Sequence, residues 1–183
     1  MTRALVERAQ AGDRDAYELL ARGAARRLFL VASRVLRDTD AADDAVQQTL
    51  VAIWRDLGSL RDPDRFEAWS YRMLIRYCRA ESRSRRRSGV VVVDLSDSMV
   101  ATGDAIAEVA DRDRLTRAFD GLSREHRTVV VLHHLAGLSQ GEIASILDVP
   151  YGTVGSRLHH ALLAMRATID AADRVAIPKG ELA

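Results

Sequence analysis

The sequence contains one cysteine, Cys78, few aromatic residues (5%) and no long apolar run. A lone thiol excludes an intrachain disulfide and any metal site built from several cysteines. No apolar run approaches the ~20 residues that a membrane-spanning helix needs. No apolar signal core follows the N-terminus either. We therefore expect a cytoplasmic protein with no membrane insertion.

What the chain does contain is hydrophobic residues, at 48%, many of them alanine. Alanine is the strongest helix former, whereas the aromatic residues that favour strands are scarce. A length of 183 residues suits one domain or two small ones. The formal net charge is only +1, which excludes a strong overall basic field. The composition predicts an all-α protein.

The first half predicts three long helices. Asp13 can cap a helix over residues 15–36, and the segment 38–40 separates it from a second helix over 41–57 that Gly58 ends. Asp62 and Pro63 then have the order of an N-cap and a first helical residue. The third helix carries Phe66 and Trp69 on a stripe that we expect to be core, and it ends in the arginine-rich run 83–87.

The second half predicts a linker followed by a further set of helices. Residues 88–103 lack helical periodicity, and the four valines at 90–93 predict an extended segment that docks on another surface. Helices are expected from 104 to near Gly121, from the cap Ser123 to Leu135, over 140–147 and from 151 to about 169. The predicted divisions are two small helical domains at 1–87 and 104–170, the linker 88–103 and a tail at 171–183. We expect the linker to be flexible and long enough to make the domains independent bodies.

Residues 138–165 have the pattern of a helix-turn-helix motif. Val154, Leu158, Ala161 and Met165 form one apolar stripe, which leaves a face of small and polar residues pointing outward. Such a face can approach DNA and bond to phosphates or bases. An αα-hairpin that binds only protein has the same spacing, so the spacing alone leaves both interpretations open.

The identities of the residues are more specific than their spacing. The strings LSREHR at 122–127, GLSQGEIA at 137–144 and VPYGTVGSRLH at 149–159 resemble the fourth region of bacterial RNA polymerase sigma factors. The strings DDAVQQT at 43–49 and FEAWSYR at 66–72 resemble their second region. Since no longer middle domain is present, the chain is similar to sigma factors of the extracytoplasmic-function (ECF) class.

The resemblance implies partners and contact residues. The partners are the clamp and flap of core RNA polymerase, promoter DNA and an anti-sigma factor. It implies polymerase contacts at Asp44, Gln47, Gln48, Ile53 and Trp54. It implies contacts to the −10 element at Tyr71, Arg72, Arg76, Arg79 and Arg83. It implies contacts to the −35 element at Thr153, Ser156, Arg157, His159 and His160.

No sequence pattern indicates catalysis. The chain has no nucleophile elbow, phosphate-binding glycine loop or metal-ligand spacing, so we expect no catalytic residues, cofactor or metal. Two other functions fit the helical pattern: a stand-alone helix-turn-helix regulator of transcription, and a helical adaptor that binds only protein. A regulator of that kind has no need of the clamp-like string at 43–49.

Overall fold

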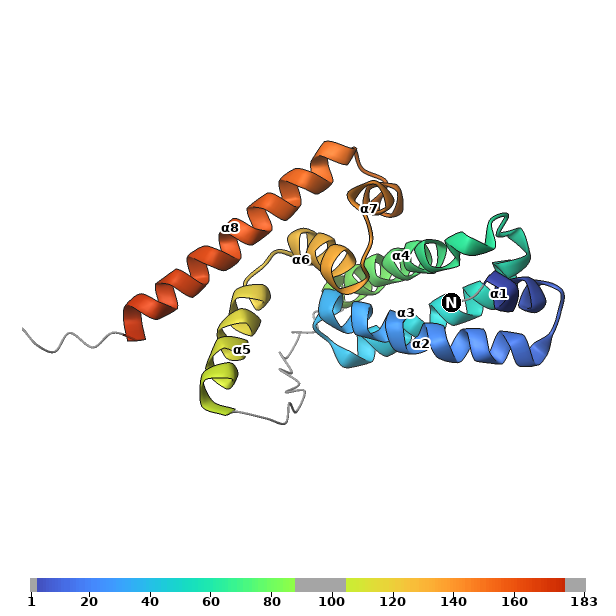
Figure 1. Cartoon of the computed structure of the whole chain (residues 1–183), viewed down its shortest axis with the longest axis horizontal. Coiled ribbons are helices and arrows are strands. Elements are labelled where there is room, and N and C mark those ends of the chain that lie inside the picture. Colours follow the sequence, from blue (N-terminus) through green and yellow to red (C-terminus); the bar gives the residue numbers. More distant parts are fainter. Residues whose placement is uncertain (1–2, 88–104, 177–183) are drawn as a thin grey trace, which may run out of the picture.

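The computed structural model describes residues 3–87 and 105–176, and every regular element in these two ranges is a helix (Figure 1). The all-α prediction is confirmed. The α-helices are α1 (Arg3–Gln10), α2 (Arg14–Leu36), α3 (Thr39–Asp56), α4 (Phe66–Arg87), α5 (Ala105–Asp120), α6 (Arg124–Val130), α7 (Gln140–Leu147) and α8 (Tyr151–Ala176). Three short elements complete the set: the 3₁₀ helices η1 (Leu57–Ser59) and η2 (Pro63–Arg65), and the π-helix η3 (Val131–Leu135).

Helices begin where the sequence places capping side chains. The carboxylate of Asp13 accepts a hydrogen bond from the amide of Ala16 at 3.0 Å, and Asp38 does the same for Ala41 at 2.9 Å. Ser139 forms the complete capping box with Glu142 at the start of α7. Each cap satisfies an amide that the first turn of a helix leaves without an intrahelical partner, so these predicted starts are confirmed.

Helix ends and one whole helix differ from the prediction. Gly58 does not end α3 in a left-handed conformation; it lies within η1, whereas Arg37 takes the left-handed position after α2 with φ 56°. Helix α1 was not predicted, although Gly12 follows it with φ 91°, a conformation that glycine adopts at little cost. Helix α8 continues to residue 176, so the predicted tail begins inside it.

Helices α1–α4 form an N-terminal unit (residues 3–87), on the right in Figure 1. Helices α2, α3 and α4 pack on one another, and α1 packs on α2. The largest side chains buried among them include Leu20, Leu28, Ile53, Phe66 and Leu74. Phe66 is therefore core, as predicted, and half-buried Trp69 packs beside it with ring centroids 6.1 Å apart.

Helices α5–α8 form a C-terminal unit (residues 105–176), in which α8 packs on α5, α6 and α7. Ile143 and Leu147 of α7 are buried together with Val154 and Leu158 of α8. The stripe predicted for the helix-turn-helix motif thus fixes the angle between α7 and α8.

The two units are not independent bodies, which differs from our expectation. Helix α4 packs on α7, and α2 packs on α6 and η3, so one hydrophobic core runs through both units. The predicted linker 88–103 and its four valines lie outside the described residues. None of the described helices is long and apolar enough to cross a membrane.

Candidate nucleic-acid and partner interfaces

Helix α3 presents a mixed face to solvent. Asp44, Gln47 and Gln48 are exposed near its start, and Val51 and Trp54 are exposed one and two turns later. These positions follow the spacing of one helical face. The indole of Trp54 is held edge-on against Tyr17 of α2, with ring centroids 4.4 Å apart, so its position is fixed although it is exposed. A fixed aromatic ring beside polar groups is typical of a protein-binding surface.

Ile53 does not belong to this face, and its predicted contact with polymerase is wrong. Its side chain is 0% exposed, whereas that of its neighbour Trp54 is 58% exposed. Adjacent residues of a helix point about 100° apart, so when Trp54 faces solvent, Ile53 faces the core between α2, α3 and α4.

Helix α4 carries a row of exposed arginines, Arg72, Arg76, Arg79 and Arg83. Their spacing of three or four residues places them along one side of the helix. Arg76 lies over the ring of Tyr77, 5.1 Å from its centroid. Arg85, from the arginine-rich run, instead forms an ion pair with Asp38 and ties the end of α4 to the start of α3.

Tyr71 is buried, so its predicted contact with DNA is wrong for this arrangement. Only 4% of the residue is exposed. Its hydroxyl interacts with Arg27 of α2, and burial raises the pKa of Tyr71. A ring held in this way has no free face on which a base could stack.

Two of the exposed arginines contact the C-terminal unit. Arg72 donates a hydrogen bond from Nη2 to the carbonyl of Ser145 at 2.7 Å, and Arg79 donates from Nη2 to the carbonyl of Leu147 at 3.1 Å. Both acceptors lie in the last turn of α7. The sequence gives no sign of these contacts, because the partners are 73 and 68 residues apart.

The start of α8 presents the face predicted to read DNA. Ser156, His159 and His160 are exposed and Thr153 is half-buried. Arg157 differs from them, because its Nη2 forms an ion pair with Glu125 of α6 at 2.6 Å. Its guanidinium must leave this carboxylate before it can contact a phosphate.

The histidines of this region do not form a metal site. The ring of His160 lies 6.4 Å from that of His126 and 5.7 Å from that of His159, measured between centroids. Within residues 3–87 and 105–176, no group of three or more side chains has the arrangement of metal ligands.

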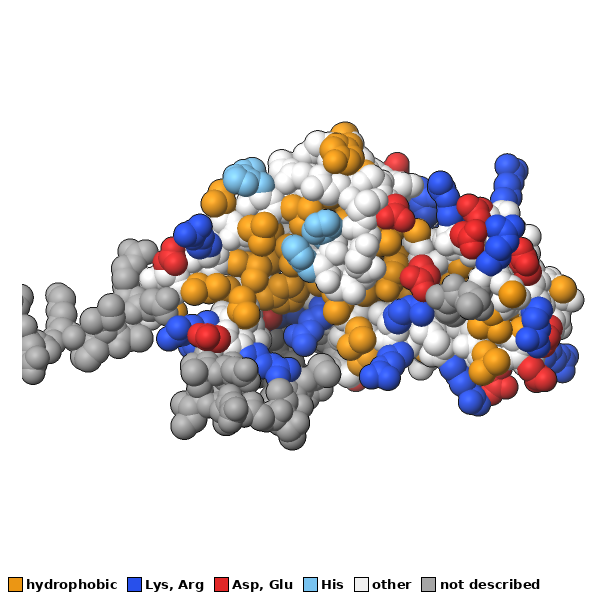
Figure 2. Space-filling model, in the orientation of Figure 1, with side chains coloured by type: hydrophobic (Ala, Val, Ile, Leu, Met, Phe, Trp, Pro, Cys, Tyr) orange, Lys and Arg blue, Asp and Glu red, His pale blue; other side chains and the backbone are white. Residues whose placement is uncertain are grey.

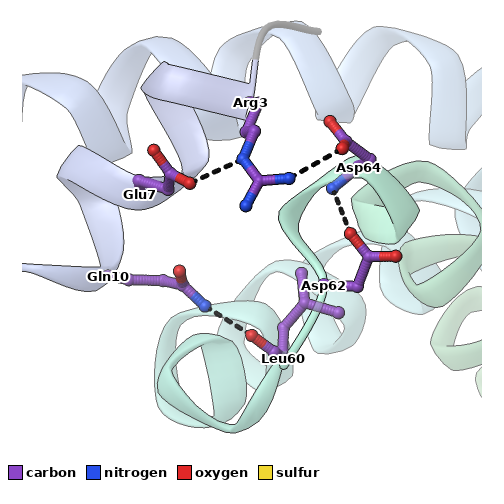
Figure 3. A network of polar contacts seen from close by, with 6 residues as sticks. All are labelled: Arg3, Glu7, Gln10, Leu60, Asp62 and Asp64. Atoms are coloured by element: carbon purple, nitrogen blue, oxygen red, sulfur yellow. Dashed lines mark hydrogen bonds and ion pairs between the residues drawn. The ribbon is translucent and has the colours of Figure 1, made fainter.

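The loop that precedes α4 is held by α1, which sequence reasoning missed (Figure 3). The side-chain amide of Gln10 donates to the carbonyls of Leu57 at 3.0 Å and Leu60 at 2.7 Å. Arg3 bridges Glu7 and Asp64, with donor–acceptor distances of 2.7 and 2.9 Å. Helix α1 therefore fixes the entry into α4 and, through it, the start of the arginine row.

We predict that Gln10→Ala lowers the free energy of unfolding by about 1–3 kcal/mol, because two partly buried carbonyls lose their donor. Urea denaturation followed by circular dichroism measures this. The control is Glu7→Ala on the same helix, which removes only an exposed ion pair worth about 0.2–1 kcal/mol. Equal losses in the two variants would contradict a role for Gln10 in holding the loop.

Comparisons with known proteins match both helical units to one family. The family model "Sigma-70 region 2" matches residues 20–88, and "Sigma-70, region 4" matches residues 112–165. The chain is 33% identical over 173 residues to the ECF RNA polymerase sigma-E factor of Escherichia coli (strain K12), covering 86% of this chain and 88% of that protein. It is 29% identical over 169 residues to the RNA polymerase sigma-H factor of Pseudomonas aeruginosa, with coverage of 86% and 88%.

Two solved structures share the fold. CnrH in complex with the cytosolic domain of CnrY superimposes with a TM-score of 0.67 at 27% identity, covering 92% of this chain and 97% of CnrH. The sigma factor RpoE in complex with the anti-sigma factor NepR, from Bartonella quintana, gives a TM-score of 0.71 at 22% identity, with coverage of 84% and 96%. The similarity therefore spans both helical units.

Proposed function

This chain belongs to the ECF class of RNA polymerase sigma factors. We propose which of its surfaces bind the polymerase and which bind the promoter during transcription initiation. A sigma factor directs initiation and is not itself an enzyme, so the chemistry is that of the polymerase. The proposal rests on one observation: the chain combines the mixed face on α3, the arginine row on α4 and a helix-turn-helix motif. Neither a stand-alone regulator nor an adaptor accounts for the match at residues 20–88.

The mixed face of α3 is the proposed contact with the polymerase clamp. Asp44, Gln47 and Gln48 supply hydrogen-bonding groups, and Trp54 supplies an aromatic anchor. Interfaces of this kind take most of their affinity from a few such anchors. The complex would act in the cytoplasm, where the polymerase transcribes.

The polymerase flap is the proposed partner of a second, apolar surface on the C-terminal unit. Figure 2 shows hydrophobic side chains gathered between α5, α6 and α8. The exposed leucines of the C-terminal unit are Leu115, Leu135, Leu162 and Leu163. Large exposed apolar patches generally mark sites of protein association.

The arginine row on α4 is the proposed −10 surface. Arg72, Arg76, Arg79 and Arg83 present guanidinium groups along one side of a helix. Guanidinium forks match phosphate oxygens and stack on unpaired bases. Tyr71 has no part in this proposal, because it is buried.

The start of α8 is the proposed reader of the −35 element. Its outward face is small and polar, and its inward face is fixed by Val154 and Leu158. That geometry suits entry into the major groove. The proposed base contacts are Ser156, His159 and His160. Thr153 can bond a phosphate or a base, and Arg157 is the proposed phosphate contact.

Control by an anti-sigma factor is also part of the proposal. CnrH, similar over 92% of this chain, was solved with a bound cytosolic domain of CnrY, and RpoE with the anti-sigma factor NepR. A protein partner of that kind would compete with polymerase for the same exposed surfaces. Co-purification of this chain with a candidate partner, followed by loss of core binding, tests the idea.

The deciding experiment is run-off transcription with purified core polymerase, this protein and a library of promoters. The proposal requires transcripts that start only when the protein is added and only from a subset of the library. Binding to palindromic duplex DNA without any effect on core polymerase would favour the stand-alone regulator. No effect of either kind would favour the adaptor.

We predict that two substitutions on α8 affect this selection differently. His160→Ala should cost about 1–3 kcal/mol at one position of the upstream element, because a base contact is lost. Arg157→Ala should weaken binding to all promoters alike and reduce the salt dependence by about one unit, because a phosphate contact is lost. Promoter selection at several salt concentrations measures both effects. A uniform loss for His160→Ala, with unchanged base preference, would contradict its assignment as a base reader.

A further inference from the structure

We propose that, in the free protein, the C-terminal unit covers part of the arginine row on α4, so that the two units must separate before Arg72 and Arg79 can bind promoter DNA. The inference rests on the proposed function, since it takes these arginines to be DNA contacts. The intramolecular partner that covers this surface is the C-terminal end of α7.

The first support is the chemistry of the acceptors. Arg72 and Arg79 donate to the carbonyls of Ser145 and Leu147 at 2.7 and 3.1 Å. The last four carbonyls of a helix have no intrahelical donor, and the helix end carries a partial negative charge. A guanidinium bonded there is held by oxygen acceptors that carry negative charge, as the oxygens of a phosphate do. The end of α7 and the DNA backbone therefore compete for the same groups.

The second support is the burial of α6. Six successive residues, 127–132, are buried through the end of α6 and the start of η3. A helix covered on one side only exposes part of each turn. Here α8 covers one side and α2, from the N-terminal unit, covers another. The two units thus share a hydrophobic core in addition to the hydrogen bonds at their surfaces.

The third support is that this core is imperfect. Arg127 is only 9% exposed, and within the described residues no acceptor bonds its Nε or Nη1. The charged groups around it are Arg37, Arg124 and Asp120, and burial lowers the pKa of Arg127 to about 10. It therefore stays charged at neutral pH, and two unsatisfied donors on a buried charge destabilise the arrangement that buries them.

A cavity of about 630 Å³, partly open to solvent, also lies between the units. Ile75, Cys78 and Arg79 of α4 line it on one side, and Arg124 and Thr128 of α6 are among the residues that line it from the C-terminal unit. Across this cavity the two units do not pack directly on each other, so the contact between them is less extensive than in a fully packed core. The cavity and Arg127 together make separation less costly than opening a fully packed core.

Cys78 provides a natural probe of this separation. It is 1% exposed, and burial raises the pKa of its thiol to about 12. The thiolate is the reactive form, so a cysteine in this state reacts slowly. Because residues of both units line the cavity beside it, separation opens a path to the thiol.

The test measures the rate at which a thiol reagent, 5,5′-dithiobis(2-nitrobenzoate), modifies Cys78 in the native full-length protein. Arg37→Ala removes a hydrogen bond to the carbonyl of Asp120 at 2.7 Å and an ion pair with its carboxylate at 3.4 Å, both between the units. We expect the reaction to become about tenfold faster. Arg34→Ala, at an exposed site on the same helix, is the control and should leave the rate unchanged.

Arg127→Met should act in the opposite direction, since it removes the two unsatisfied buried donors and puts an apolar side chain in their place. We expect Cys78 to react about tenfold more slowly than in the wild type. Thermal unfolding by circular dichroism confirms that each variant folds. A wild-type rate equal to that of the denatured protein would show that the units are not closed, and would overturn the proposal.

Run-off transcription with limiting amounts of each protein then tests the masking itself. Arg37→Ala should yield several-fold more transcript than the wild type, and Arg127→Met several-fold less. If the thiol rates change as expected but transcript levels do not, the units close without masking the DNA surface and the proposal is wrong. If no variant, the wild type included, supports transcription, the proposed function fails, whereas the thiol rates still report whether the units close.

Discussion

The double variant Asp44→Arg, Gln47→Ala is expected to lose binding to core RNA polymerase while folding like the wild type. Both side chains are exposed on the proposed clamp-binding face of α3, so their replacement leaves no void in the core. A reversed charge in the middle of an interface repels the groups that attracted it, and truncation of the neighbour removes a second contact. We expect a loss of at least about 4 kcal/mol, or roughly 1,000-fold in Kd.

Fluorescence anisotropy of the labelled protein with core polymerase measures this affinity. The control is Asp15→Arg, which reverses an exposed charge on α2 and changes the net charge equally. It should bind core polymerase nearly as well as the wild type. Full affinity in the double variant would remove α3 from the proposed interface, and an equal loss in the control would indicate a general effect of charge.

Ile53→Ala and Trp54→Ala are expected to give opposite results although the residues are adjacent. Ile53 is completely buried, so its truncation should lower the free energy of unfolding by about 2–5 kcal/mol. Trp54 is mostly exposed and loses mainly its contact with Tyr17, so its truncation should cost about 1 kcal/mol of stability. Its larger effect should be on polymerase affinity, by about 2 kcal/mol or more.

Chemical denaturation and core-binding assays on both variants separate the two roles. The expected pattern is a stability defect without an intrinsic binding defect for Ile53→Ala, measured where the variant is still folded, and the reverse for Trp54→Ala. A stable Ile53→Ala variant that fails to bind would return Ile53 to the interface.

The starts of the helices could be predicted from the sequence because their causes are local. Asp13, Asp38 and Ser139 each bond an amide three residues ahead, so nothing beyond one helical turn is needed to recognise them. The apolar stripe of the helix-turn-helix motif is equally local. Helix α1 was missed because a helix of eight residues has little stability by itself and depends on packing against α2 and the loop before α4.

The direction in which each candidate side chain points could be predicted only in part. A period of 3.6 residues identifies the centre of a helix's buried face, and Phe66 was assigned correctly on that basis. The width of the buried face depends on how many other helices cover it. Because α4 packs on α2, α3 and α7, its buried face is wide enough to include Tyr71. The same reasoning explains the burial of Ile53 beside an exposed Trp54.

The sequence by itself determined the helical class, the helix-turn-helix motif and the family resemblance, since each of these depends on short stretches of neighbouring residues. Only the tertiary structure decided that the two units share a core and that Arg72 and Arg79 end on the carbonyls of α7. Those contacts join residues about 70 positions apart, and backbone carbonyls are present in every sequence. No pattern of letters can therefore indicate which of them an arginine will reach.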